Sequence, residues 1–344
     1  MAAFRIGLVG AGRMGRTHLR ALAGAELVRI TAVAEPSPRA RAELAGTGPA
    51  AGRPRTGAGR DLAVHASVAE LLDRSAPDGV LIAAPSGRHG ELIAEVAASG
   101  VPILCEKPCG LRPEQAAAAA RTAASAGVPL QVAYWRRYVP SLQALRERIA
   151  ADDLGGIHLL ACYQWDGAPP AAGFRAHSGG IFVDMGVHEF DQLRWLTGQD
   201  IGAVRAVAAG LVGDPAVRGD VDSAQLLAEL SGGSVGLVSL GRHHPAGDMC
   251  RAEAFGTAGT VRCDFLDPAD GDRAQLDALR RQAEDFAVLA GGGTGSGATA
   301  ADAVAALDAA ERATAAVPAL AARRDRAQGS CVAADPAAQR AGTP

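Results

Sequence analysis

Short apolar runs alternate with amphipathic stretches over the first 130 or so residues. The strand-like runs, rich in Val, Ile, Leu and Ala, lie at 4–9, 27–34, 78–85, 101–108 and 128–134. Stretches with helical spacing separate them, at about 14–23, 88–98 and 113–126, and Ser67 with Glu70 has capping-box spacing for another helix. This alternation predicts a parallel sheet with helices on both of its faces.

The pattern changes after about Trp135. A basic helix is expected over 138–151, and apolar runs then follow without regular helices between them. These runs lie near 201–212, 224–230, 234–240, 251–255 and 260–265. They predict an antiparallel sheet, and Ala-rich helices are expected after it at 273–290 and 299–315.

The expected fold class is therefore α/β, with two domains. Residues 1–134 would form a doubly wound parallel sheet. Residues 135–320 would form an α+β domain with a mainly antiparallel sheet. Gly- and Pro-rich residues 46–60 predict a flexible loop, and residues 321–344 predict a disordered tail.

Composition excludes several classes of protein. The length of 344 residues is suitable for two domains. The net charge is −3 and charges of both signs are scattered along the chain, so no basic cluster indicates nucleic-acid binding. No apolar run reaches the roughly 18–20 residues that a membrane span needs, and the start does not read as a signal peptide. The six cysteines form no C-x-x-C pair, so we expect reduced thiols and a cytoplasmic protein.

One basic residue stands out from the rest. Lys107 is the only lysine among 34 Lys and Arg residues, and only lysine offers a compact ammonium whose pKa shifts readily. It follows the run at 101–105, so it would lie at the carboxyl end of a parallel strand, where open α/β sheets bind ligands. The alternative is that a single lysine persists by chance.

A glycine motif follows the first strand. Gly10-x-Gly12-x-x-Gly15 would make a tight turn, let the backbone approach a pyrophosphate, and place a helix N-terminus against the anion. Glu35 ends the second strand, where a carboxylate binds the adenosine ribose hydroxyls and favours NAD. Ser37 and Arg39 lie just beyond and could cradle a phosphate, so NADP stays possible. The alternative is a plain strand-to-helix turn.

A second chemical signal lies in "SGGIFVDMGVHEFDQLRWLTG", residues 178–198, which reads as an amphipathic helix ending at Gly198. Asp184 and His188 interrupt its apolar pattern four positions apart, a spacing that places both on one helix face. The pair could be catalytic or a local surface hydrogen bond. A metal site is not expected, because "HEFDQ" is not H-E-x-x-H and no third ligand is obvious.

Together, "GLVGAGRMGRTH", "EKP" at 106–108 and "GGIFVDMGVHEFDQLRWLTG" resemble the Gfo/Idh/MocA oxidoreductases, and within them the inositol 2-dehydrogenases. The resemblance spans about residues 4–315. It implies that residues 1–134 are a dinucleotide-binding Rossmann domain and that residues 135–320, with an open sheet, serve substrate binding and oligomerisation. It also implies that Lys107, Asp184 and His188 face the nicotinamide ring. His188 would be the general base, Asp184 would bind an adjacent hydroxyl and tune the histidine, and Lys107 would orient the reacting hydroxyl. The proton could instead pass through Lys107.

The resemblance also implies further contacts. The expected cofactor-binding residues are Gly10, Gly12, Arg13, Met14, Gly15, Glu35, Pro85, Ser86, His89, Glu106 and Lys107, although His89 could equally be a surface residue. The expected substrate-binding residues are Lys107, Tyr134, Trp135, Asp166, Asp184 and His188, with Arg136 beside them. Tyr134 and Trp135 could instead pack between the domains. The chain departs from the inositol dehydrogenases at Trp165, where they carry arginine, and near Gly247, where they offer a tyrosine.

These features predict an NAD(P)-dependent dehydrogenase that acts on a ring secondary alcohol of a cyclic polyol or sugar. We expect a homo-oligomer, a dimer or tetramer, with no nucleic-acid or membrane partner. Two other functions remain open on the same fold: a non-catalytic NAD-binding regulator and an NAD-dependent glycosidase. Net NADH production with free polyols would distinguish a dehydrogenase from both.

Overall fold

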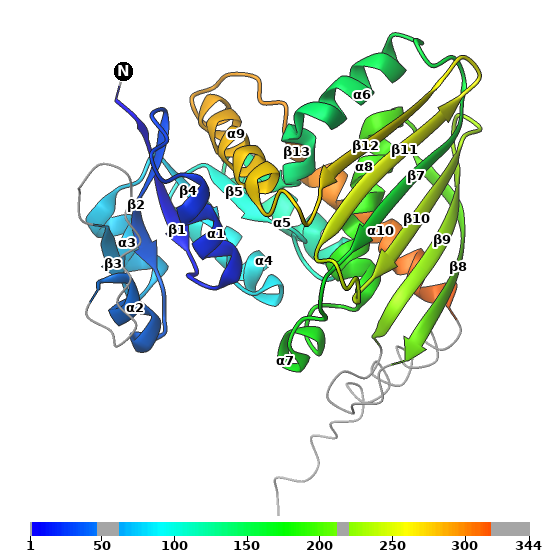
Figure 1. The fold of residues 1–344 in the computed structure, drawn as a ribbon. Helices are drawn as coiled ribbons and strands as arrows, with labels where there is room; N and C mark the ends of the chain where they lie inside the picture. The colour runs from blue at the N-terminus through cyan, green and yellow to red at the C-terminus, as the bar shows by residue number, and fades with distance from the viewer. Residues whose placement is uncertain (1, 47–61, 212–219, 318–344) are drawn as a thin grey trace, which may run out of the picture.

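Two sheets lie side by side in the computed structural model, which describes residues 2–46, 62–211 and 220–317 (Figure 1). The first sheet has the order β13-β6-β5-β4-β1-β2-β3, and all its pairs except β13–β6 are parallel. Its strands are β1 (Phe4–Val9), β2 (Val28–Ala34), β3 (Ala63–His65), β4 (Gly79–Ile82), β5 (Ile103–Glu106), β6 (Leu130–Ala133) and β13 (Ala298–Thr299). The predicted parallel sheet is confirmed.

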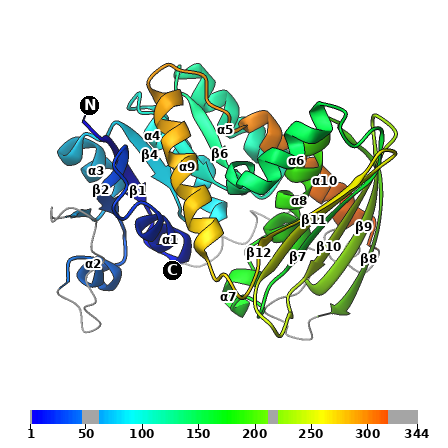
Figure 2. The ribbon, with the colours of Figure 1, turned by 45° about the horizontal axis from the view of Figure 1, so that its top comes forward.

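Helices flank the first sheet on both faces, as the alternation predicted (Figures 1 and 2). They are α1 (Arg13–Ala21), α2 (Pro38–Leu44), α3 (Val68–Ser75), α4 (His89–Ala97) and α5 (Pro113–Ser125). Ser67 caps α3, because its hydroxyl accepts a hydrogen bond from the Glu70 backbone N–H. The strands β1 and β4 are buried on both faces, which explains their continuous apolar sequences.

The second sheet has the order β12-β11-β7-β10-β9-β8 and is mainly antiparallel, with one parallel pair, β7–β10. Its strands are β7 (Ile157–Trp165), β8 (Ile201–Leu211), β9 (Val221–Leu230), β10 (Val235–Gly241), β11 (Met249–Gly256) and β12 (Thr260–Leu266). The helices α6 (Pro140–Ala150) and α8 (Val187–Thr197) pack on one face of it, and α7 (Ala172–Arg175) is a single turn (Figure 2). The opposite face exposes Val207, Leu227, Val235 and Phe255.

The end of the described chain returns to the first sheet. Helix α9 (Arg273–Ala290) packs on α1 and inserts Phe286 beside Phe4, with ring centroids 5.9 Å apart in an edge-to-face contact. Strand β13 then pairs with β6. Parts of residues 135–320, the range expected for the second domain, therefore complete the first.

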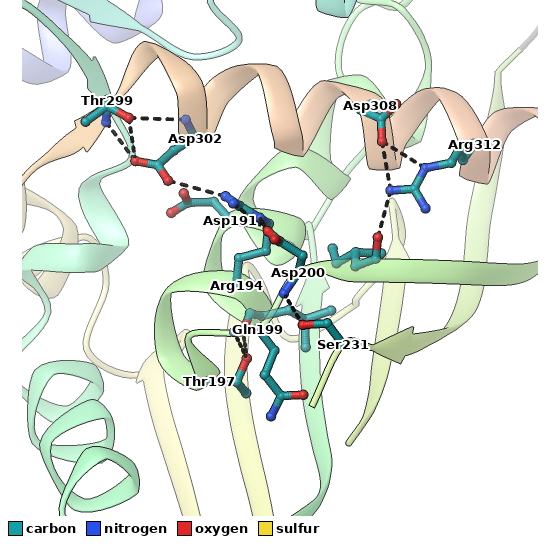
Figure 3. Close-up of polar contacts among 12 residues, drawn as sticks. Asp191, Arg194, Thr197, Gln199, Asp200, Ser231, Thr299, Asp302, Asp308 and Arg312 are labelled. Carbon is teal, nitrogen blue, oxygen red and sulfur yellow. Dashed lines mark hydrogen bonds and ion pairs between the residues drawn. The ribbon is translucent and has the colours of Figure 1, made fainter. Parts of the chain in front are cut away.

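Helix α10 (Ala300–Ala315) joins the two layers (Figure 3). Thr299 and Asp302 form a capping box at its start, and Asp302 also accepts a hydrogen bond of 3.3 Å from Arg194 of α8. The helix packs against both α5 and α8. It fixes the helix that carries His188 relative to the first sheet.

Two expectations fall outside the described residues: the tail at 321–344 and, apart from residue 46, the loop at 46–60. Within the part of the chain that the structure describes, no helix combines the length and the apolar character required to cross a membrane.

Candidate active site

The glycine turn between β1 and α1 has the geometry of a phosphate cradle. Gly10 has φ +95°, and an added Cβ would lie 2.8 Å from the Ala83 carbonyl oxygen. At Gly15 a Cβ would lie 2.1 Å from the Gly10 oxygen, so only glycine lets the helix pack on the turn. A Cβ at Gly12 would meet nothing within 4 Å, which leaves the backbone N–H groups at the start of α1 open to an anion.

Glu35 lies immediately after β2 and faces this turn. Its Oε2 accepts a hydrogen bond from the Ala11 N–H (2.8 Å), and its Oε1 accepts one from the Ser37 N–H (2.9 Å). The carboxylate is therefore fixed where the adenosine ribose of a dinucleotide would lie. Arg39, which could have bound a 2′-phosphate, is exposed and paired with Glu43.

The loop after β5 places Lys107 at the carboxyl edge of the sheet. Its Nζ donates a hydrogen bond of 2.6 Å to the backbone carbonyl of Asp184. Burial lowers the pKa of Lys107, and the nearby charge of Asp184 opposes this shift. Arg13, at the start of α1, also lowers the pKa of Lys107, so the cradle and the lysine share one electrostatic environment.

Two expected cofactor residues, Glu106 and His89, make hydrogen bonds that hold this loop in place. Glu106 is buried and lies 2.6 Å from the Nε2 of His18 on α1, and its other oxygen accepts the Lys107 N–H. His89 is buried, not a surface residue, and its two ring nitrogens lie 2.8 Å from the carbonyls of Ala84 and Pro108. Pro85 and Ser86, by contrast, lie on the partly exposed turn after β4.

Asp184 lies in a π-helical segment, Phe182–Gly186, which runs directly into α8. A π segment contains one more residue per turn than an α-helix, and such segments occur frequently at functional sites. The Asp184 carboxylate pairs with Arg242, whose Nη1 lies 2.9 Å from Oδ2. The expected tuning of His188 by Asp184 has no hydrogen bond to support it among the described residues.

His188 is buried at the start of α8, between two aromatic rings. Its ring lies edge-to-face with Tyr134 and Trp135, with centroids 5.9 and 6.3 Å away. Its Nδ1 is buried without a hydrogen-bond partner in the described chain. Burial lowers the pKa of His188 well below its usual value, and the charges of Lys107 and Arg136 lower it further. The imidazole is therefore neutral at pH 7 and able to accept a proton.

Asp166, a further expected substrate residue, follows β7. It accepts a hydrogen bond of 3.1 Å from Gln164, and burial raises its pKa. The charge of Asp184 also raises this pKa, and the charge of Arg242 lowers it. Trp165, at the position where the inositol dehydrogenases carry arginine, packs on Gly241, where an added Cβ would lie 2.2 Å from its ring.

Tyr134 and Trp135 are both buried, and Arg136 beside them is paired with Glu189 of α8. Sequence reasoning missed Arg242, because nothing in an arginine-rich chain distinguishes it before its tertiary partner is known. It also missed His18, for which the only signal was its place within "GRTH".

Comparisons with known proteins identify a family match for each of the two parts of the chain. Residues 4–134 match the family described as "Oxidoreductase family, NAD-binding Rossmann fold", and residues 142–262 match "GFO/IDH/MocA C-terminal domain". The chain is 50% identical over 314 residues to a Rhizobium meliloti protein named "Rhizopine catabolism protein MocA", covering 91% of this chain and 95% of the relative. It is 30% identical to an inositol 2-dehydrogenase of Rhizobium meliloti strain 1021, covering 80% of each chain.

A solved structure extends the likeness to the fold. The crystal structure of a myo-inositol dehydrogenase from Corynebacterium glutamicum superposes with a TM-score of 0.78 at 27% identity. The match covers 92% of this chain and 96% of the other. The two matched families divide the chain as its two sheets do, and the glycine turn precedes the helix as a Rossmann fold requires. The chain therefore belongs to the Gfo/Idh/MocA family of NAD-binding oxidoreductases.

Proposed function

We propose that this protein is an NAD-dependent dehydrogenase that oxidises a ring secondary alcohol of a cyclic polyol or sugar, such as an inositol. The observation that carries the proposal is the bond from Lys107 to the Asp184 carbonyl beside the glycine turn, with the charge of Lys107 acting on His188. The inositol dehydrogenases among the relatives support the substrate class.

The residues present fit a dinucleotide, since the open Gly12 backbone and the fixed Glu35 carboxylate match its pyrophosphate and ribose. Bound NAD supplies the hydride acceptor. His188 takes the hydroxyl proton, because its neutral imidazole is the available base. Lys107 orients the reacting oxygen and stabilises the developing negative charge. Asp184 keeps one oxygen on Arg242 and offers the other to a neighbouring hydroxyl.

Specificity for NAD over NADP is also part of the proposal. The Glu35 carboxylate would repel a 2′-phosphate, and its oxygens already accept two backbone N–H groups that hold it in place. Arg16 on α1 and Arg39 on α2 are both paired with Glu43, and Arg41 on α2 donates to the carbonyls of Glu35 and Pro36. This pairing favours the unphosphorylated ribose.

We further propose that residues 1–134 bind the dinucleotide, that residues 135–320 bind the substrate, and that the protein forms a cytoplasmic homo-oligomer. The exposed apolar side chains on the outer face of the second sheet, Val207, Leu227, Val235 and Phe255, support self-association. The five described cysteines are free and buried, which fits a reducing compartment. Light scattering on the wild type and on Leu227→Glu tests the oligomer.

The decisive experiment is a spectrophotometric screen of inositols and hexoses with NAD and with NADP. The proposal expects stoichiometric NADH formation with at least one polyol and a preference for NAD. A regulator would bind NAD without turnover, and a glycosidase would cleave a glycoside without net NADH. Either of those results would contradict the dehydrogenase function.

A further inference from the structure

A buried chain of alternating charges leads away from the candidate active site. Arg242, immediately after β10, is completely buried, and its Nη1 and Nη2 lie 2.9 Å from Asp184 and 3.3 Å from Asp220. Asp220 in turn lies 2.7 Å from the Nε of Arg175. Arg175 also lies 3.0 Å from Asp222, the second residue of β9. The order is therefore Asp184, Arg242, Asp220, Arg175 and Asp222.

The chain of ion pairs has one functional end and one structural end. At one end, Arg175 in α7 pairs with Asp222 in β9 and so connects these two elements. Asp184 lies in the π segment, and its backbone carbonyl accepts the Lys107 hydrogen bond. A buried guanidinium requires paired partners. Arg242 donates a hydrogen bond from Nη1 to the Asp184 carboxylate, and the charge of Asp220 lies close to its Nη2 without a hydrogen bond.

The main-chain position of Arg242 strengthens this arrangement. Its N–H donates a hydrogen bond of 2.8 Å to the Asp222 carbonyl across the β9–β10 pair. Leu240, two residues earlier, contacts the π segment beside Gly186, so the side chains on this face of β10 point toward Asp184. The strand therefore presents the guanidinium to Asp184 as part of the sheet, which confines the carboxylate more tightly than a surface loop would.

We propose that Arg242 is a positioning residue that holds the Asp184 carboxylate in the orientation required by the substrate and neutralises its charge beside Lys107. This inference rests on the proposed dehydrogenase function. Without Arg242, Asp184 would be free to turn toward the ammonium of Lys107. The reacting hydroxyl would then lose its orientation, and the lysine would be paired more strongly than the reaction requires.

The lone lysine provides a direct test that needs no turnover. Protein labelled with ¹³C only at lysine Cε gives a single side-chain resonance, from Lys107, whose titration is followed by NMR. We expect the Lys107 pKa to rise in Arg242→Gln, because the negative charge of Asp184 is then uncompensated. It should fall in Asp184→Asn. The other charged groups that act on Lys107, which are Glu106, Arg13 and Arg136, are retained in both variants, and His188 stays neutral. Asp166 responds to both Asp184 and Arg242, so its own titration is followed alongside.

Arg175→Gln is the matched control, since it removes another buried arginine of the same network at its structural end. It should leave the Lys107 titration at the wild-type position. Should Arg242→Gln fail to fold, Arg242→Met replaces the guanidinium with an apolar side chain that a buried site tolerates better. An unchanged Lys107 pKa in a folded Arg242 variant would overturn the proposal.

Kinetics provide the second test. We expect Arg242→Gln to lower kcat by roughly 10²-fold with little change in NAD affinity, and Arg242→Lys to recover part of the loss. In an Asp184→Asn background, Arg242→Gln should have little further effect, because it acts through that carboxylate. Additive losses would overturn the positioning role. Wild-type protein without turnover on any polyol would instead count against the proposed function, and the NMR titration would still decide the role of Arg242.

Discussion

The Nζ of Lys107 donates a hydrogen bond to the backbone carbonyl of Asp184, 77 residues later in the chain. The lysine thus binds the main chain of the π segment, and the Asp184 carboxylate is left to Arg242. The group that orients the ammonium of Lys107 is therefore a backbone carbonyl, which does not titrate. Each of the predictions below depends on this contact or on the glycine turn beside it.

Lys107→Arg should be severely impaired although it keeps its charge. A planar guanidinium is larger than an ammonium and cannot form the same short bond to one carbonyl. We expect kcat to fall by about 10²–10³-fold, the usual loss when a donor to a developing oxyanion is removed. Steady-state kinetics measure it, with Arg121→Lys on the exposed side of α5 as a control for arginine–lysine exchange. Activity within a few-fold of wild type would exclude a specific role for the ammonium.

His188→Ala should lower kcat by about 10²–10⁴-fold, because it removes the proposed base. NAD affinity should be nearly unchanged, since the glycine turn and Glu35 do not contact this ring. Calorimetric titration with NAD and initial-rate kinetics separate the two effects. His158→Ala, at an exposed position of β7, is the matched control and should behave as wild type. Normal turnover in His188→Ala would remove the histidine from the mechanism.

The pH profile of oxidation should show an acid limb below pH 6.5. Protonated His188 cannot accept a proton, and burial together with the charge of Lys107 lowers the pKa of this imidazole. Activity is therefore lost only as the pH falls through that lowered pKa. In Lys107→Met the positive charge that lowers the pKa of His188 is absent. The acid limb in the pH profile of the remaining kcat/KM should therefore move to higher pH. A limb that moves to lower pH would contradict the assignment.

Gly12→Ala should weaken NAD binding without unfolding the protein. A Cβ at Gly12 meets no protein atom within 4 Å, and its φ of −69° suits alanine, so the fold has room for it. The methyl group would, however, occupy the space that the pyrophosphate needs. Gly90→Ala is the matched control on α4, where an added Cβ also meets nothing within 4 Å. Thermal unfolding should be unimpaired in both variants, and NAD titration should distinguish them.

Glu35→Ser should reduce the preference for NAD over NADP. The substitution removes the carboxylate that accepts the Ala11 and Ser37 N–H groups and that would repel a 2′-phosphate. We expect kcat/KM with NAD to fall by about tenfold or more, as for the loss of hydrogen bonds to a charged group, while NADP use improves. The ratio of kcat/KM for the two cofactors measures the change. An unaltered ratio would show that another residue discriminates between them.

The sequence predicted β1, β2, β4, β5 and β6 of the first sheet because each is a mostly buried apolar run. It did not predict β3, which has three residues, of which one is buried. The glycine turn, Lys107 and the Asp184–His188 segment were also identifiable, since each combines residue type with a defined place in the fold. The π segment was not predictable, because an apolar pattern near the helical period fits an α-helix equally well. Strand β13 has two residues, too few for any periodic signal.

The supporting residues were the harder part of the site. Glu106 and His89 were expected at the cofactor, and the sequence did not indicate that they also bond His18 and the carbonyls of Ala84 and Pro108. Arg242 carried no sequence signal at all. Such roles arise from side-chain pairs brought together by tertiary folding, and spacing along one element contains no information about them.

Because α9 and β13 return to the first sheet, the two parts of the structure are not formed by two consecutive, independent segments of the chain. A fragment ending at residue 134 would lose Phe286 from the core beside Phe4 and would leave the outer side of β6 without its partner strand. The nucleotide-binding half can therefore reach its mature form only after residues near 299 have been added to the growing chain. Exchanging that half between relatives would require the distal segments to be exchanged with it.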